Sequence, residues 1–173
     1  MNFAFLHYNI CRRKNRRKTV FYGKVFMNTY IKIKKVNPNA IVPKYGSDDA
    51  VCADLYACTE YDVAINPGET KLIPTGIAIE TPVGLGAFIF ARSGLATKQG
   101  LAPANKVGVV DPDYRGEIMV ALHNHSNDTR VVKNGDRVAQ LGFIPYVIGK
   151  FMEVDELNDT NRGAGGFGST GSN

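Results

Sequence analysis

One short segment combines residue types that suit anion binding. The run ARSGLA places Arg92 and Ser93 before Gly94 at the end of an apolar stretch. A guanidinium fork, a hydroxyl and an unhindered backbone amide together favour an anion such as phosphate. The same residues are also typical of a strand that ends in a turn with a surface arginine. Taken alone, the segment favours this plainer interpretation.

Two further segments place polar residues at predicted turns. In GVVDPDYRGEI, residues 111–113 read Asp-Pro-Asp and predict a β-turn between two strands, with Tyr114 beside it. An aspartate and a tyrosine at a hairpin tip are usually turn chemistry alone. In NGDRVAQLGF, a turn at residues 134–136 precedes a strand. If that strand is regular, the side chains of Arg137 and Gln140 lie on opposite faces.

A carboxylate also occurs inside an apolar strand. Asp54 belongs to the run CADLYA, where its neighbours on both sides predict burial. Burying an unpaired carboxylate is costly, so Asp54 needs a cationic partner. Arg92 and Arg137 are the candidates.

The elements that must position these residues are predicted to be strands. From Met27 onward, YIKIKKV, KLIPTGIAIE, GAFIFA, GEIMVALHN and RVAQLGFIPYV are short runs rich in Val, Ile and aromatic residues, separated by turn formers. ATKQGL is expected to supply one helical turn. The pattern predicts an all-β sandwich, jelly roll or closed barrel.

Composition predicts an ordinary globular domain. The chain has 173 residues and is 44% hydrophobic, which fits one domain with tails. No apolar run is long enough to cross a bilayer, and we expect no membrane partner. The three cysteines, Cys11, Cys52 and Cys58, have no zinc-like or redox spacing and fit a reducing compartment such as the cytoplasm.

The positive charge is concentrated at the N-terminus. Residues 1–26 carry seven Lys or Arg and no acidic residue, whereas the remaining fourteen basic residues are outnumbered by sixteen acidic ones. The extension reads as a basic arm for nucleic acid or nuclear import, as an organelle presequence, or as a leader without function before Met27. Nothing downstream supports nucleic-acid binding, so we favour the leader and expect a cytoplasmic location. A nuclear or organellar location follows if the extension is a targeting signal.

The C-terminal segment NRGAGGFGSTG holds five glycines around Phe167. Glycine loses much backbone entropy on ordering, so the segment is either a disordered remnant or becomes ordered with a ligand. Such a ligand would have to contact Phe167, the hydroxyls of Ser169 and Thr170, and backbone amides.

The order and spacing of these clusters resembles the five-motif signature of the trimeric dUTP diphosphatases (dUTPases), over residues 30 to 171. The motifs are ADLYA, PVGLGAFIFARSGLA, NKVGVVDPDYRGEI, GDRVAQL and RGAGGFGSTG. One departure lies in the first motif, where the family usually has Ala-Gly-x-Asp. This chain has Cys52 at the glycine position.

The resemblance implies a jelly-roll-like β subunit (β-clip, dUTPase-like) with a flexible glycine-rich C-terminal arm. Its expected parts are a basic extension at 1–26, the β domain at 27–158 and a lid at 159–173. It also implies a homotrimer with sites at subunit interfaces. Each site takes the third motif from one chain, the first, second and fourth motifs mainly from a second, and the tail from the third.

The implied activity is the Mg²⁺-dependent hydrolysis of dUTP to dUMP and pyrophosphate, which keeps uracil out of DNA and supplies dUMP for thymidylate synthesis. By resemblance, Asp111 positions and deprotonates the attacking water. Asp54 acts through water and arginines. The implied phosphate contacts are Arg92, Ser93, Gly94 and Gln140. Magnesium is held by the substrate phosphates and waters, without a direct protein ligand.

Base and sugar selection are implied at other positions. The backbone around Gly108 and the side chain of Asn105 pair with uracil, and Tyr114 packs beneath the deoxyribose. The implied lid contacts are Arg162, Phe167, Gly168, Ser169 and Thr170, with Phe167 stacked on the base.

Two alternatives remain open. dCTP deaminase shares the fold, but it needs a general-base glutamate and usually has Arg-Ser-Ser, and Glu117 is not at the matching place. The other alternative is a regulatory module that uses nucleotide occupancy to control a protein partner.

Overall fold

Short antiparallel strands make up nearly all the regular structure in this computed structural model, which describes residues 29–166. The described residues belong almost entirely to the unit Ile31–Asn173, and Met1–Tyr30 is a separate unit. The basic extension at 1–26 and the predicted lid contacts Phe167, Gly168, Ser169 and Thr170 lie outside the described residues.

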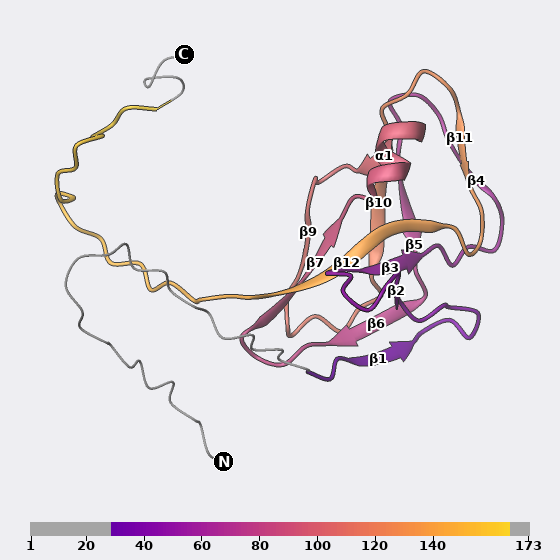
Figure 1. Cartoon of the computed structure of the whole chain (residues 1–173), viewed down its shortest axis with the longest axis horizontal. Helices are drawn as coiled ribbons and strands as arrows, with labels where there is room; N and C mark the ends of the chain where they lie inside the picture. The colour runs from indigo at the N-terminus through magenta and orange to yellow at the C-terminus, as the bar shows by residue number, and fades with distance from the viewer. Residues whose placement is uncertain (1–28, 167–173) are drawn as a thin grey trace. The chain divides into compact units, whose positions relative to one another are not determined.

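The predicted strands are present, and the chain forms more of them than the sequence indicated (Figure 1). The elements are β1 (Lys32–Lys35), β2 (Lys44–Tyr45), β3 (Ala53–Tyr56), β4 (Val63–Ile65), β5 (Thr70–Pro74), β6 (Ile77–Glu80), β7 (Leu85–Phe90), α1 (Ser93–Gln99), β8 (Leu101–Pro103), β9 (Gly108–Val110), β10 (Met119–Asn124), β11 (Arg130–Val132) and β12 (Arg137–Pro145).

The strands form two larger sheets and two strand pairs. The five-stranded sheet has the order β2-β3-β12-β7-β9, and the three-stranded sheet has the order β5-β10-β8. The pairs are β1-β6 and β11-β4, and all pairings are antiparallel. Branched and aliphatic side chains from these sheets, among them Leu55, Ile73, Leu122 and Leu141, form one buried core. The all-β prediction is confirmed.

The strand that carries the fourth motif is irregular. In β12, Arg137 pairs with Tyr56 and Ala139 pairs with Leu55, so one extra residue forms a β-bulge. Arg137 and Gln140 were expected on opposite faces only if the strand is regular, and the bulge removes that condition. Gln140 is directly opposite Asp54, and the Arg137 guanidinium also reaches the Asp54 carboxylate. The bulge therefore places Arg137 and Gln140 opposite Tyr56 and Asp54, two positions that share one face of β3.

The turn after β9 also differs from a simple hairpin tip. The amide of Tyr114 donates to the Asp111 carbonyl at 3.1 Å, which confirms the predicted β-turn. The flanking strands, however, pair with different partners, β9 with β7 and β10 with β5 and β8. The turn therefore connects the two larger sheets, and the residues after it lie where the sheets meet.

The helix is longer than the single predicted turn and begins at Ser93. Gly100 ends it with φ of 69°, a left-handed conformation that favours glycine. A Cβ at Gly100 would lie 2.9 Å from the amide nitrogen of Ser126, so this glycine also permits close backbone approach.

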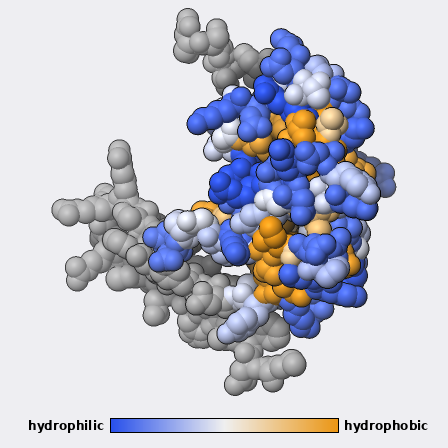
Figure 2. All heavy atoms as spheres, turned by 90° about the vertical axis from the view of Figure 1, so that its right-hand side faces the viewer, coloured by the Kyte–Doolittle hydropathy of each residue, from blue (hydrophilic) through white to orange (hydrophobic). Residues whose placement is uncertain are grey.

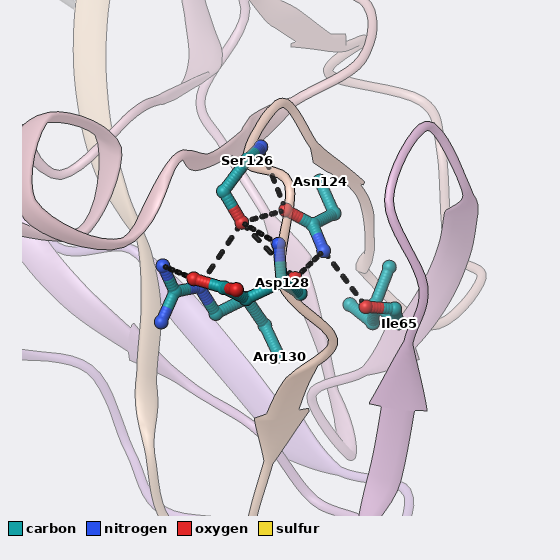
Figure 3. A network of polar contacts seen from close by, with 5 residues as sticks. All are labelled: Ile65, Asn124, Ser126, Asp128 and Arg130. Atoms are coloured by element: carbon teal, nitrogen blue, oxygen red, sulfur yellow. Dashed lines mark hydrogen bonds and ion pairs between the residues drawn. The ribbon is translucent and has the colours of Figure 1, made fainter.

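A buried asparagine anchors the chain beside this helix end. Asn124 is fully buried, and its side-chain amide donates to the carbonyls of Ile65 and Asp128, each at 2.8 Å (Figure 3). Its Oδ1 accepts from the amide and the hydroxyl of Ser126 at 2.9 and 2.7 Å. The next amide, of His125, donates to the carbonyl of Gly100. This network joins β4, the end of β10 and the end of α1.

Apolar side chains remain on the surface of the described chain. Figure 2 shows separate apolar patches among hydrophilic ones on one face. Large apolar side chains that are more than half exposed include Leu72, Val109, Ile148 and Phe151. Single exposed apolar side chains are common on protein surfaces, whereas contiguous apolar patches mark contacts with other chains.

Candidate functional site

A cavity of about 270 Å³ gathers four of the residues singled out in the sequence: Asn105, Gly108, Asp111 and Tyr114. Its wall is completed by side chains from β7, β9, β10 and the loop before β10. The full lining is Ile89, Asn105, Gly108, Val109, Val110, Asp111, Tyr114, Glu117, Ile118 and Met119. The cavity therefore combines an amide, a carboxylate and a phenol with an apolar wall, as expected of a site for a small polar ring.

A tight turn places the amide of Asn105 at this cavity. The amide of Lys106 donates to the Pro103 carbonyl at 3.0 Å, and the amide of Val107 donates to the Asn105 carbonyl at 2.7 Å. Lys106 has φ of 64°, which is uncommon for a residue with a side chain. A Cβ at Gly108 would lie 3.1 Å from the Cβ of Ile89 and 3.4 Å from Nδ2 of Asn105. Glycine at this position leaves the backbone open to a ligand.

The carboxylate of Asp111 is exposed at the start of the β-turn. Within residues 29–166 it makes no hydrogen bond or ion pair, so both oxygens are free to accept. Arg115 holds the turn from the other side, because its Nη1 donates to the carbonyls of Pro112 and Tyr114 at 2.6 and 3.0 Å. Sequence reasoning missed this function of Arg115, which depends on how the chain folds back on itself.

Tyr114 is half exposed at the cavity wall. Its hydroxyl donates to the carbonyl of Glu117 at 3.2 Å. The ring lies where a side chain at Gly116 would be, since a Cβ there would collide with the phenol. Neither Gly116 nor the Glu117 carbonyl was predicted to matter, because no sequence pattern reveals where the ring lies.

A second group of predicted residues surrounds Asp54. This carboxylate is only 6% exposed, and it accepts from Nε of Arg92 at 3.0 Å and from Nη1 of Arg137 at 3.2 Å. Nη1 of Arg92 also donates to the carbonyl of Arg137 at 3.2 Å. The prediction that Asp54 needs an arginine partner is confirmed, and both candidates supply it.

The remaining phosphate-contact candidates lie beside this ion-pair cluster. Gln140 faces Asp54 across the β3-β12 ladder and is partly buried. Ser93 and Gly94 open α1 directly after Arg92, and both are exposed. Nothing lies within 4 Å of a Cβ at Gly94, so the space on that side of its backbone is open. The four phosphate-contact candidates therefore lie around Asp54 in the fold. The Asp54 carboxylate holds both Arg92 and Arg137.

The structure does not bring the two groups into one cavity of a single chain. Neither the Asp54 cluster nor Ser93, Gly94 or Gln140 lines the cavity at Asp111. Arg92 and Arg137 instead border another hollow, of about 210 Å³, with Gln99 and Asp136. Arg162 is exposed, and its Nε donates to the Gly165 carbonyl in its own segment at 2.7 Å.

Cys52, the residue that departs from the motif, packs against another glycine. A Cβ at Gly142 would lie 2.8 Å from the Cys52 sulfur, so the cysteine occupies space that this glycine leaves free. Burial raises the pKa of the Cys52 thiol above its ordinary value. Cys52 therefore acts as a small, protonated packing residue beside β12.

Comparison with known proteins decides the family. A family model described as dUTPase matches residues 38–171, well over half of the chain. The chain belongs to the dUTPase family. The deoxyuridine 5′-triphosphate nucleotidohydrolase of Desulfitobacterium hafniense is 55% identical to it over 131 residues, which cover 75% of this chain and 87% of that protein. The resemblance noted in the five motifs is confirmed.

Solved structures of dUTPases share the fold. A mutant dUTPase of Staphylococcus bacteriophage 80alpha with dUpNHpp has a TM-score of 0.72 at 22% identity, covering 83% of this chain and 99% of that one. A mutant dUTPase from phage phi11 of S. aureus, which coordinates a structural Mg(II) ion, has a TM-score of 0.69 at 20% identity, covering 76% of this chain and 100% of that one. The predicted jelly-roll-like fold is confirmed.

Residues 29–166 contain neither a cluster of metal-binding side chains nor a membrane-spanning helix. Among these residues, no three His, Cys, Asp or Glu side chains gather closely enough to bind one metal ion. The same residues contain no helix that is long and apolar enough to span a membrane.

Proposed function

We infer that this protein is a dUTP diphosphatase, which hydrolyses dUTP to dUMP and pyrophosphate. The observation that carries the inference is the cavity that gathers Asn105, Gly108, Asp111 and Tyr114 in a chain of the dUTPase family. The reaction needs an amide to recognise the base, an aromatic ring beside the sugar and a free carboxylate to activate water. Asn105, Tyr114 and Asp111 supply these groups in turn.

Base selection is assigned to the Asn105 turn. The open backbone at Gly108 and the amide of Asn105 offer donors and acceptors to the edge of uracil. Cytosine presents a different pattern at that edge and would leave buried groups unpaired, which is strongly penalised. Thymine carries one extra methyl group, and we propose that a steric clash within the tight turn at residues 105–108 rejects it.

Sugar selection is assigned to Tyr114. Tyr114 lines the same cavity as Asp111. Packed beneath the deoxyribose, the ring would collide with a ribose 2′-hydroxyl. Tyr114→Ala is expected to lose discrimination against UTP, and unchanged discrimination would rule out this assignment.

Hydrolysis is assigned to Asp111 as general base. Its exposed carboxylate accepts a proton from water, and the resulting hydroxide attacks the α-phosphorus in line with the departing pyrophosphate. Such a reaction depends mainly on positioning and on neutralising charge at the phosphates. Arg92, Ser93, Gly94 and Gln140 supply these contacts. Asp54 keeps the arginine in place through the 3.0 Å ion pair.

Magnesium fits this arrangement as an ion that the substrate carries. With no cluster of three ligand side chains in the described residues, the donor set suits an ion bound by phosphate oxygens and waters. When bound, Mg²⁺ neutralises phosphate charge. Asp111, on its exposed turn, is close enough to the cavity to hydrogen-bond such waters.

The site is completed by other copies of the chain. Because Asp111 and Arg92 line different hollows of one chain, we propose that a homotrimer brings the third motif of one subunit to the Asp54 cluster of a second. Exposed apolar side chains such as Val109 on β9 are available for contacts in such an assembly. The tail at 159–173 is proposed to fold over the nucleotide from the third subunit, with Arg162 at a phosphate.

Assays with three deoxynucleoside triphosphates test the proposed dUTP hydrolysis. Purified protein with Mg²⁺ is given dUTP, dCTP and dTTP, and pyrophosphate and ammonia are measured. Fast pyrophosphate release from dUTP alone is expected. Ammonia release from dCTP would instead indicate a deaminase, although the Glu117 carboxylate already accepts from the amide of Gly76 at 2.7 Å. Tight dUTP binding without turnover would indicate a regulatory module.

Subunit mixing tests the shared site. Asp111→Asn and Arg92→Ala are each expected to be nearly inactive as pure assemblies. When equal amounts of the two are unfolded together and reassembled, about a quarter of all sites would receive both native residues, so activity returns. Activity that stays at the level of the pure variants would show that both residues serve the site from one chain.

A further inference from the structure

We propose that Gly116 and Glu117 are positioning residues that fix the ring of Tyr114, so that sugar selectivity depends on them. The proposal rests on the function above and extends it to residues that need not touch the sugar. Three observations support it: the space at Gly116, the tether at the Glu117 carbonyl, and the attachment of Glu117 to a neighbouring strand turn.

Gly116 leaves the space that the tyrosine ring occupies. A Cβ at this position would collide with the hydroxyl of Tyr114 and would lie 3.0 Å from the ring carbon Cε2. Real Cβ atoms do not approach other atoms so closely, and the ring would have to rotate away. The hydroxyl end of the ring therefore packs against the backbone at Gly116, and a side chain there would displace it.

The carbonyl of Glu117 holds the outer end of the same ring. The Tyr114 hydroxyl donates to it at 3.2 Å, only three residues along the chain. Tyr114 is 48% exposed, so packing alone does not fix its side-chain torsions. The hydrogen bond is thus the contact that selects one orientation of the phenol among those that the open surface allows.

Glu117 is itself fixed by the turn between β5 and β6. Its Oε1 accepts from the amide of Gly76 at 2.7 Å. The next residue adds two backbone bonds, from the Ile118 amide to the Ile77 carbonyl at 2.8 Å and from the Thr75 amide to the Ile118 carbonyl at 3.3 Å. Residues 117–118 are therefore attached to residues 75–77, which makes the Glu117 carbonyl a rigid acceptor.

This rigidity matters for a steric selection. A ring that can rotate aside admits the extra hydroxyl of a ribose, whereas a ring packed against Gly116 and tethered at its hydroxyl does not. Loosening the tether should therefore raise kcat/KM for UTP while leaving that for dUTP nearly constant or lower. A change confined to overall stability would lower both values together and would not alter their ratio.

The experiment compares Glu117→Ala with two controls. Glu117→Gln keeps an oxygen that accepts from Gly76, and Glu69→Ala removes a carboxylate that also accepts a backbone amide, from Asn66 at 2.8 Å, on another loop. The readout is the ratio of kcat/KM for dUTP to that for UTP. Loss of one hydrogen-bonded tether is expected to lower the ratio about five- to tenfold in E117A. E117Q and E69A should stay within about twofold of the wild type.

A second pair of variants separates the tether from general damage. Tyr114→Phe removes the hydroxyl and should lower the ratio, and adding Glu117→Ala to it should lower the ratio little further, because both changes break one linkage. Should E117A fail to fold, Gly116→Ala displaces the ring without changing Glu117 and should lower the ratio as well.

Different results would refute the proposed function and the inference about Gly116 and Glu117. A wild-type protein that does not hydrolyse dUTP overturns the proposed function and this inference with it. A wild-type protein that hydrolyses dUTP selectively, with ratios unchanged in E117A and G116A, overturns the inference alone. An equal loss in E117Q and E117A would also overturn it, since the bond to Gly76 would then be irrelevant.

Discussion

Replacing Asp54 by asparagine should destabilise the fold more than its small change in shape suggests. The carboxylate is almost fully buried and accepts from Arg92 and Arg137. Asparagine keeps the shape but removes the charge, and it leaves two guanidinium groups close together without a counter-charge. Breaking a fully buried ion pair by changing one partner costs about 3–5 kcal/mol.

The actual cost should be smaller because the arginines are partly solvated. The side chain of Arg92 is 23% exposed and that of Arg137 is 53% exposed. The second pair therefore contributes only about 0.5–1 kcal/mol, as surface pairs do. We expect a loss of about 2–3 kcal/mol in the free energy of unfolding, which for a domain of this size lowers Tm by about 5–10 °C.

Urea and thermal denaturation at one fixed protein concentration measure this effect, since assembly makes stability concentration-dependent. Asp111→Asn is the matched control, because that carboxylate is exposed and makes no ion pair within residues 29–166. It should change stability by less than about 0.5 kcal/mol. An Asp54→Asn protein as stable as this control would refute the idea that Asp54 holds the arginine cluster together.

Three further predictions concern the network at Asn124, an imidazole and the tail. Asn124→Ala removes four hydrogen bonds of a fully buried side chain and should cost about 3 kcal/mol in urea denaturation; a loss under about 1 kcal/mol would contradict the network. Partial removal of water from its ring, together with positive charge on His123 and Lys106, lowers the pKa of the exposed His125 side chain. The unfolded chain thus binds this proton more readily, so stability should fall as pH drops through about 6.5, and less steeply in His125→Gln; equal pH profiles would contradict this. Deleting residues 161–173 should leave assemblies that bind nucleotide but turn over far more slowly, whereas full activity would rule out a lid.

Much of the fold was predictable because its signals are local. Alternating apolar runs predict strands wherever one face is buried, and the Asp-Pro-Asp turn carries its own backbone preferences. The pairing of Asp54 with arginine was also predictable, since a buried carboxylate is destabilising unless a cationic side chain or hydrogen-bond donors accompany it. The family motifs then placed Asn105, Gly108 and Tyr114 together, as the cavity has them.

The structural features that the sequence did not predict depend on contacts between distant segments. The bulge before Ala139 adds one residue to β12 without any change of composition, yet it moves Arg137 towards Asp54. Glu117 bonds to an amide 41 residues away, and Asn124 bonds to a carbonyl 59 residues away. Such partners follow from how the sheets pack, which no short pattern contains.

The rate of dUTP hydrolysis by Asp111→Asn is the most direct test of the account. Single-turnover hydrolysis and nucleotide binding are measured for the wild type, for Asp111→Asn and for Asp113→Asn, a matched change two residues away in the same exposed turn. Removing a general base should slow hydrolysis by about 10²- to 10⁴-fold while dUTP still binds. Asp113→Asn should remain close to the wild type. An Asp111→Asn protein that hydrolyses dUTP at the wild-type rate would contradict the assignment of this cavity as the catalytic site.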